Sequence, residues 1–345
     1  MSRMGFPPGS HRFTQRKRIM QNPIVKYILN NHILTTVLLV AFALFLFEIR
    51  AILIAVFISY IITASLHPFV RTLRNFKVPK IAAIILVYTV TIAFIILLVI
   101  PILPFFISQV QALLKAIPAY VNSASQALGI EISRSQVNSM IAPLASAIGQ
   151  NAFSITGKVF GGLFSILTIF ILSFYMLIDR HRLGQTIEDL FPSRYREKAT
   201  LTIHLVEQKL GAWLRGQVVL SLVVGTITWV ALTLLGIPFA LPLAIMAGFL
   251  EIIPTLGPII AAIPATIVGL AISPVMAVTV ILVYTGIQLS ENNILVPKIM
   301  QKAVGLNPVI IIVAILIGGN LFGVVGALLS IPFVSAAIII FRALK

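Results

Sequence analysis

Apolar residues occupy most of the chain in long runs, separated by short polar or charged stretches. The first runs fall within residues 33–107, and another follows at 158–178. A transmembrane helix needs about 20 consecutive apolar residues, and several of these runs approach or exceed that length. The pattern therefore predicts an all-α, polytopic membrane protein with about 8 membrane segments.

Two stretches are too polar to span a bilayer. Residues 108–157 and residues 179–215 both carry apolar side chains at helical spacing, which predicts amphipathic helices packed on the membrane surface or on neighbouring spans. The second stretch is also rich in acidic and basic residues. The apolar stripes consist of Val110, Leu113, Leu114 and Ile117 in the first stretch and Ile203, Val206, Leu210 and Trp213 in the second.

The last third of the chain, residues 216–345, repeats one arrangement twice. A span is followed by two short apolar pieces that flank a break rich in glycine, proline and polar residues. Paired interrupted segments of this kind indicate the binding site of a secondary transporter, so we interpret 216–345 as a transport core. Each broken pair is either a re-entrant hairpin or two short full spans. We favour opposed hairpins, with both breaks at mid-membrane depth facing a polar cavity.

Composition supports the membrane interpretation and charge orients the chain. Hydrophobic residues make up 59% of the sequence, charged residues only 10%, and mean hydropathy is +1.08, values that exclude an ordinary soluble protein. The net charge of +16 is explained by basic loops on the cytoplasmic side rather than by nucleic acid. Residues 1–32 (a basic tail), 67–80 and 179–215 are then cytoplasmic, 108–157 is extracytoplasmic, and both termini lie in the cytoplasm.

Glu251 and Glu291 are the acidic residues of the apolar last third. A charge at the bilayer centre costs roughly 2.5–3.5 kcal/mol even on lenient scales, so such residues usually face a cavity or a partner. Both are candidates to bind a proton, a cation or a substrate hydroxyl. The alternatives are a structural bond at the break for Glu251 and an interfacial pairing with Lys298 or Lys302 for Glu291.

The breaks supply further candidate residues for a polar solute. Freed backbone groups and half-helix ends, together with neutral amide side chains, bind such solutes in transporters. Alternatively, the glycines serve only close helix packing. The candidates beside the two glutamates are Pro254, Gly257, Pro258, Gln288, Asn292, Asn293, Gly319, Asn320 and Gly323.

No enzymatic or cofactor chemistry is expected. The chain has no cysteine, its histidines lack metal-ligand spacing, and it has no phosphate-binding loop for ATP. We therefore expect no metal, no cofactor and no catalytic set.

Several motifs resemble the autoinducer-2 exporter family of bacterial membrane proteins, also described as PerM-like permeases. They are Glu251–Pro258 (EIIPTLGP), Glu291–Met300 (ENNILVPKIM), Val304–Pro308 (VGLNP) and the later pattern of Gly318, Gly319, Phe322, Gly323, Gly326, Leu329 and Pro332. The resemblance implies a homo-oligomeric transporter in the bacterial inner membrane. The expected function is proton-driven export of a small polar solute, such as an autoinducer-2-like molecule; the alternative is sodium–proton antiport.

Overall fold

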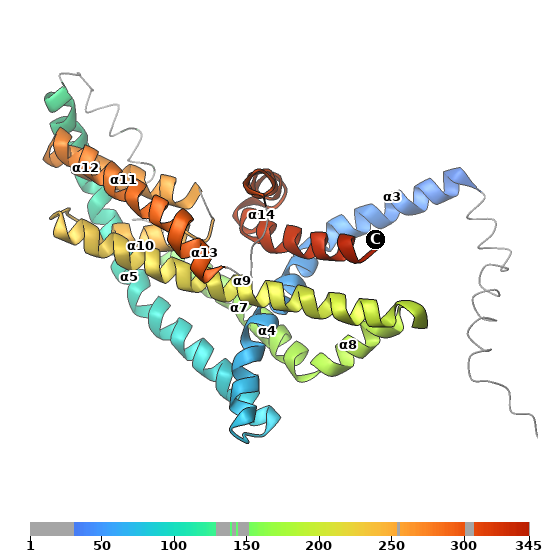
Figure 1. Ribbon diagram of the computed structural model, residues 1–345. Helices are drawn as coiled ribbons and strands as arrows, with labels where there is room; N and C mark the ends of the chain where they lie inside the picture. The colour runs from blue at the N-terminus through green and yellow to red at the C-terminus, as the bar shows by residue number, and fades with distance from the viewer. Residues whose placement is uncertain are drawn as a thin grey trace, which may run out of the picture. The chain divides into compact units, whose positions relative to one another are not determined.

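The computed structural model describes residues 31–128, 139, 143, 152–253, 256–300 and 307–344 (Figure 1). The chain divides into two units, residues 1–57 and 58–345. The first unit contains α3 (His32–Glu48) and the beginning of α4 (Arg50–Asn75). Asn31 caps α3, because its Oδ1 accepts a hydrogen bond from the Leu34 amide at 3.3 Å. Nearly all of the basic tail predicted for residues 1–32 lies outside the described residues.

The second unit holds the remaining helices. They are α5 (Lys80–Leu128), α7 (Ala152–Ile178), α8 (Arg180–Asp189), α9 (Ser193–Leu234), α10 (Ala240–Leu250), α11 (Leu256–Ile272), α12 (Pro274–Ser290), the π-helical turn η1 (Glu291–Leu295), α13 (Val296–Ile299) and α14 (Pro308–Leu344). Every regular element in the described residues is helical.

The prediction of an all-α, polytopic membrane protein is confirmed. Among the described residues, five helices are long and apolar enough to cross a membrane. There are six if α7 and α8, which are bent by 75° at their junction, form one span. The shorter helices α3, α10 and α11 are also apolar.

Two helices are longer than the hydrophobic pattern indicates. α5 continues from the third apolar run into the predicted surface segment and ends only at Leu128; most of the rest of that segment lies outside the described residues. α9 joins the charged stretch before Arg215 to the following span in one helix of 42 residues. It ends where Gly236, at φ +66°, lets the Ile237 amide bond back to the Leu232 carbonyl at 3.0 Å.

One core packs α4, α5 and α7 around Tyr88. Its ring meets those of Phe170 and Phe174 edge-on, at centroid distances of 6.2 and 5.3 Å. The Tyr88 hydroxyl lies 2.5 Å from the Ser173 hydroxyl, which also lies 3.0 Å from that of Thr63. These hydrogen bonds between helices satisfy polar groups that an apolar interior would otherwise leave unpaired.

A second core packs α10 against α9 and α11 against α12, and Figure 1 shows these four helices alongside one another. The turn between α10 and α11 is tight. A Cβ atom at Gly257 would overlap the main-chain carbonyl of Leu250, so the return of the chain requires glycine there. The first broken unit is therefore a helical hairpin.

The second broken unit, α14, also folds back on itself. Helical geometry fails at Phe322 and at Gly323, whose φ is +62°. Gly318 and Gly326 lie in backbone contact, although eight residues of straight helix would separate them by about 12 Å. The two arms of α14 therefore run side by side near the break, an arrangement that a re-entrant hairpin and two short spans would share.

The close packing in α14 predicts that alanine substitution destabilises the protein at one of two adjacent glycines and not at the other. Gly318→Ala would place a Cβ atom against the Gly326 carbonyl and the Ser330 hydroxyl, whereas a Cβ at Gly319 makes an ordinary 3.7 Å contact with Ala327. Overpacking costs about 1–3 kcal/mol. Gly318→Ala should lower the thermal unfolding midpoint of the purified protein by several degrees, and Gly319→Ala should leave it unchanged. Equal midpoints would contradict the fold-back.

The predicted orientation is tested by cysteine labelling of this cysteine-free chain. Ser123 lies near the end of α5, on the expected outer side, and Ser193 begins α9, on the expected cytoplasmic side. In intact cells, an impermeant maleimide should label Ser123→Cys, and it should label Ser193→Cys only after lysis. Labelling of both from one side would refute the orientation.

Candidate functional site

The structure brings together Glu251 and Glu291, which are 40 positions apart in sequence. Glu251 follows the last residue of α10, at the turn of the first hairpin, and Glu291 begins η1 at the end of α12. They are 0% and 2% exposed, and their carboxyl groups lie close enough to interact electrostatically. A pair of carboxyl groups is thus enclosed among the helices of the predicted transport core.

Few hydrogen-bond donors serve this pair. Gln288 donates from Nε2 to Oε2 of Glu291 at 3.2 Å. Both carboxyl oxygens of Glu251 are buried without a hydrogen-bond donor in the described part of the protein. Two ionised carboxylates this close repel each other, and burial away from water strengthens that repulsion. The carboxyl pair is therefore an unstable arrangement unless something positively charged is present.

Local sequence explains how each glutamate reaches this position. Gly257 permits the tight hairpin turn and Pro258, which has no amide proton, begins the next helix without leaving a donor unpaired. At the other side, the π-helical turn inserts one extra residue per turn and redirects Glu291 relative to α12. Gln217 of α9 fastens the turn by donating to the main-chain carbonyl of Glu251 at 2.7 Å.

The core between the hairpin and α12 is apolar. Leu243, Ala247, Ala261 and Val268 of the hairpin pack with Tyr284 of α12, and the Tyr284 hydroxyl is buried with no hydrogen-bond partner among the described residues. No ion pair of Glu291 is recorded there either, and Lys302 lies outside the described residues. The interfacial pairing considered for Glu291 thus has no support from Lys298.

The other sequence-predicted residues are distributed around this pair and on α14. Gly257 and Pro258 are buried at the hairpin turn, Gln288 contacts Glu291, and Pro254 lies outside the described residues. Asn292 and Asn293 are exposed, and the Asn293 amide donates to the Leu289 carbonyl at 2.8 Å.

Gly319, Asn320 and Gly323 belong to the α14 hairpin. α14 packs on α9, and in the described residues it has no packing of similar extent on α10, α11 or α12. That the two breaks face one another across a polar cavity therefore stays a prediction.

Sequence reasoning missed Gln217 as a neighbour of the site. It is a polar residue within an apolar helical stretch, which is a recognisable signal. Within the described residues no group of three or more His, Cys, Asp and Glu side chains is placed to hold a metal ion. The chemistry available here is proton or cation binding by two carboxyl groups.

The match to a known family covers almost all of the helices in the described residues. The model of a family described as AI-2E family transporters matches residues 33–345. This range includes the carboxyl pair, both hairpins and the long helix α9. The chain belongs to the AI-2E transporter family.

Individual relatives of this AI-2E family transporter match it over about half of its length or over more than four fifths of it. It is 28% identical to the protein YueF of Bacillus subtilis (strain 168) over 307 residues, which cover 84% of this chain and 83% of YueF. It is 25% identical to AI-2 transport protein TqsA of Escherichia coli (strain K12), covering 81% of this chain and 83% of TqsA. YrrI of Bacillus subtilis (strain 168) is 34% identical over 48% of this chain and 47% of YrrI.

Because the carboxyl oxygens of Glu251 have no donor in the described residues, we expect the carboxyl pair to lower the stability of the folded AI-2E family transporter. Glu251→Gln keeps the shape of the side chain, removes one charge and supplies an amide donor to Glu291. Since a buried unsatisfied polar group costs about 1–3 kcal/mol, we expect a thermal midpoint several degrees higher than that of the wild type.

The matched control is Glu197→Gln, at an exposed glutamate of α9, which should leave the midpoint unchanged. A clear fall in the midpoint of Glu251→Gln would mean that the ionised side chain stabilises the fold, contrary to this interpretation.

Proposed function

We propose that this multi-pass membrane transporter exports a small polar solute, of the autoinducer-2 type, against entry of protons, and that Glu251 and Glu291 form its proton site. The observation that carries the proposal is the buried carboxyl pair with no donor for Glu251. A single proton shared between the two groups would supply that donor and remove the repulsion.

The position of the pair supports a role in coupling. Glu251 lies on the turn between α10 and α11, and Glu291 on the π-helical turn after α12. Movement of the hairpin relative to α12 would separate the two carboxyl groups and favour release of the shared proton. Binding of a proton would conversely favour the closed arrangement, which is the reciprocal linkage that a coupled transporter needs.

The solute class rests on family membership and on the polar groups near the breaks. The relative TqsA is named an AI-2 transport protein. In this chain, we assign solute contact to Gly257 and Pro258 in the first turn of α11 and to the amides of Gln288, Asn292 and Asn293, with Gly319, Asn320 and Gly323 contributing from α14. We also propose a homo-oligomer in the bacterial inner membrane, with both termini in the cytoplasm.

The proposal predicts how Glu251→Gln affects transport. In inside-out vesicles with an acidic lumen, the wild-type protein should accumulate AI-2 above the external concentration. The Glu251→Gln protein, which cannot exchange the shared proton, should fall to the level seen without a gradient. It should still exchange labelled for unlabelled AI-2 at equilibrium, which shows that it is folded and binds the solute. Glu197→Gln should behave as the wild type.

Accumulation by Glu251→Gln equal to that of the wild type would reject the proton site. A second measurement distinguishes solute export from sodium–proton antiport. Addition of sodium in the absence of AI-2 should not change the luminal pH. A sodium-dependent pH change that is lost in Glu251→Gln would replace solute export with sodium–proton antiport.

A further inference from the structure

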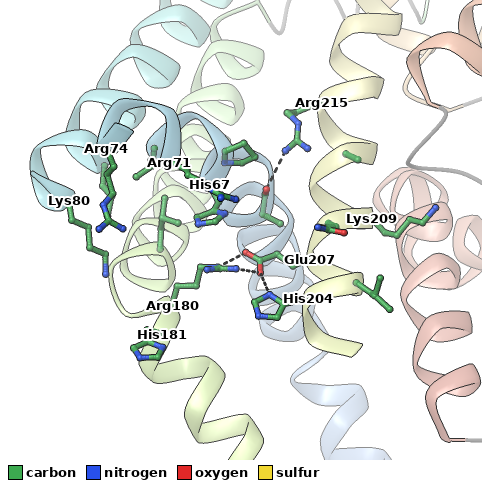
Figure 2. Close-up of a pocket in the computed structure, with 18 residues that line it drawn as sticks. His67, Arg71, Arg74, Lys80, Arg180, His181, His204, Glu207, Lys209 and Arg215 are labelled. Carbon is green, nitrogen blue, oxygen red and sulfur yellow. Dashed lines mark hydrogen bonds and ion pairs between the residues drawn. The ribbon is translucent and has the colours of Figure 1, made fainter. Parts of the chain in front are cut away.

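A second polar site of the 58–345 unit shares no lining residue with the carboxyl pair. Four helical segments enclose a cavity of about 1050 Å³: the second half of α4, the start of α5, the α7–α8 junction and α9 (Figure 2). Its lining residues are strongly basic. The cationic ones are Arg71, Arg74, Lys80, Arg180, Lys209 and Arg215.

Glu207 does not neutralise this cluster. It is the one acidic residue among the described residues that line the cavity. Its two carboxylate oxygens accept from Nε and Nη2 of Arg180, both at 2.6 Å, and Nδ1 of His204 lies 3.9 Å from Oε2. The carboxylate therefore balances Arg180 alone, and this bidentate pair fixes the beginning of α8 against α9.

The remaining cations are held by neutral groups or have no carboxylate partner. Lys80 donates to the Ile178 carbonyl at 2.7 Å, and Arg215 donates to the Ser65 carbonyl at 2.9 Å. Carbonyl acceptors fix the position of these side chains without cancelling their charge. No ion pair of Arg71 or Arg74 is recorded in the described residues. Lys209 extends away from the other labelled cations in Figure 2 and does not join their cluster.

Four positive charges, those of Arg71, Arg74, Lys80 and Arg215, therefore line the cavity without acidic compensation. Like charges gathered in a concave site repel one another and concentrate anions. Arginine's planar fork binds two oxygens of a carboxylate or of a phosphate equally well. A phosphomonoester dianion carries about two charges and three terminal oxygens, so it can engage more than one of these cations at once, which a single carboxylate does less well. Apolar walls formed by Val70, Ile84 and Leu177 leave room for the carbon part of an organic phosphate.

We propose that this cavity binds the dianionic phosphate of a phosphomonoester, with Arg71 and Arg74 as the residues that recognise it. The cavity is far larger than inorganic phosphate requires, and its volume suits a small organic ligand or a head group. The expected orientation places the cavity at the cytoplasmic side of the membrane. Two sources share this chemistry there: a water-soluble phosphomonoester and the head group of phosphatidic acid.

The test measures the thermal midpoint of the intact protein with two probes. The soluble probe is glycerol 3-phosphate, titrated into protein in detergent. The lipid probe is phosphatidic acid, added to phosphatidylcholine nanodiscs, with phosphatidylglycerol as a singly charged diester for comparison. A ligand that binds only the folded state stabilises it by RT ln(1 + [L]/Kd), so the rise of the midpoint with ligand concentration yields an apparent Kd.

The variant Arg71→Gln/Arg74→Gln should weaken the apparent Kd by about tenfold or more, because two charge-assisted hydrogen-bonding groups are lost. The control Arg182→Gln/Arg194→Gln removes equal charge from exposed positions outside the cavity and should bind as the wild type does.

Binding of glycerol 3-phosphate identifies a soluble ligand, and binding of phosphatidic acid alone identifies a lipid. Either result supports the proposal if it depends on Arg71 and Arg74. The proposal is overturned if neither probe binds, if the control weakens binding equally, or if phosphatidylglycerol binds as tightly as phosphatidic acid.

Discussion

Two buried carboxyl groups that lie close together impose the main constraint on this protein. Neither Glu251 nor Glu291 has access to water, and Glu251 receives no hydrogen bond from the described residues. Isolated buried charges are costly, so the pair persists only if a proton or another cation relieves it. The tight turn at Gly257, the π-helical turn and the anchor from Gln217 all serve to hold the groups in this unfavourable proximity.

α9 connects the carboxyl pair to the second site, the basic cavity. Arg215 contacts the carbonyls of Ala64 and Ser65 in α4, and two residues later Gln217 holds the carbonyl of Glu251. The helix is continuous through both positions. A shift of α9 that alters the contact of Arg215 with α4 would therefore also alter the contact of Gln217 with Glu251. This gives the two sites a direct physical connection.

The sequence was sufficient to predict features that follow from the free-energy cost of one residue type in its local surroundings. Glu251 and Glu291 stand out because acids are expensive in apolar surroundings, and the glycines of α14 indicate a break because only glycine allows Gly318 and Gly326 to touch. The proximity of the two glutamates was not predictable. It depends on the register of α12 against the hairpin, which side-chain packing sets.

The continuity of α5 and α9 and the basic cavity were missed for a different reason. Changes in hydrophobicity mark the membrane boundary, and a helix can cross that boundary without a break, as α9 does near Arg215. The arginines of the cavity fit the positive-inside rule, so sequence gave no reason to look for a second role. Only their convergence in three dimensions distinguishes a binding site from a membrane flank.

Infrared difference spectroscopy tests the central claim, the shared proton, most directly, because it needs neither a substrate nor a gradient. A spectrum between neutral and strongly alkaline pH should show loss of a protonated carboxyl band in the wild type. Glu251→Gln and Glu291→Gln should each change the frequency or the intensity of that band, and Glu197→Gln should leave it as in the wild type. A wild-type spectrum without a protonated carboxyl band, or a band unaffected by both substitutions, would contradict the account.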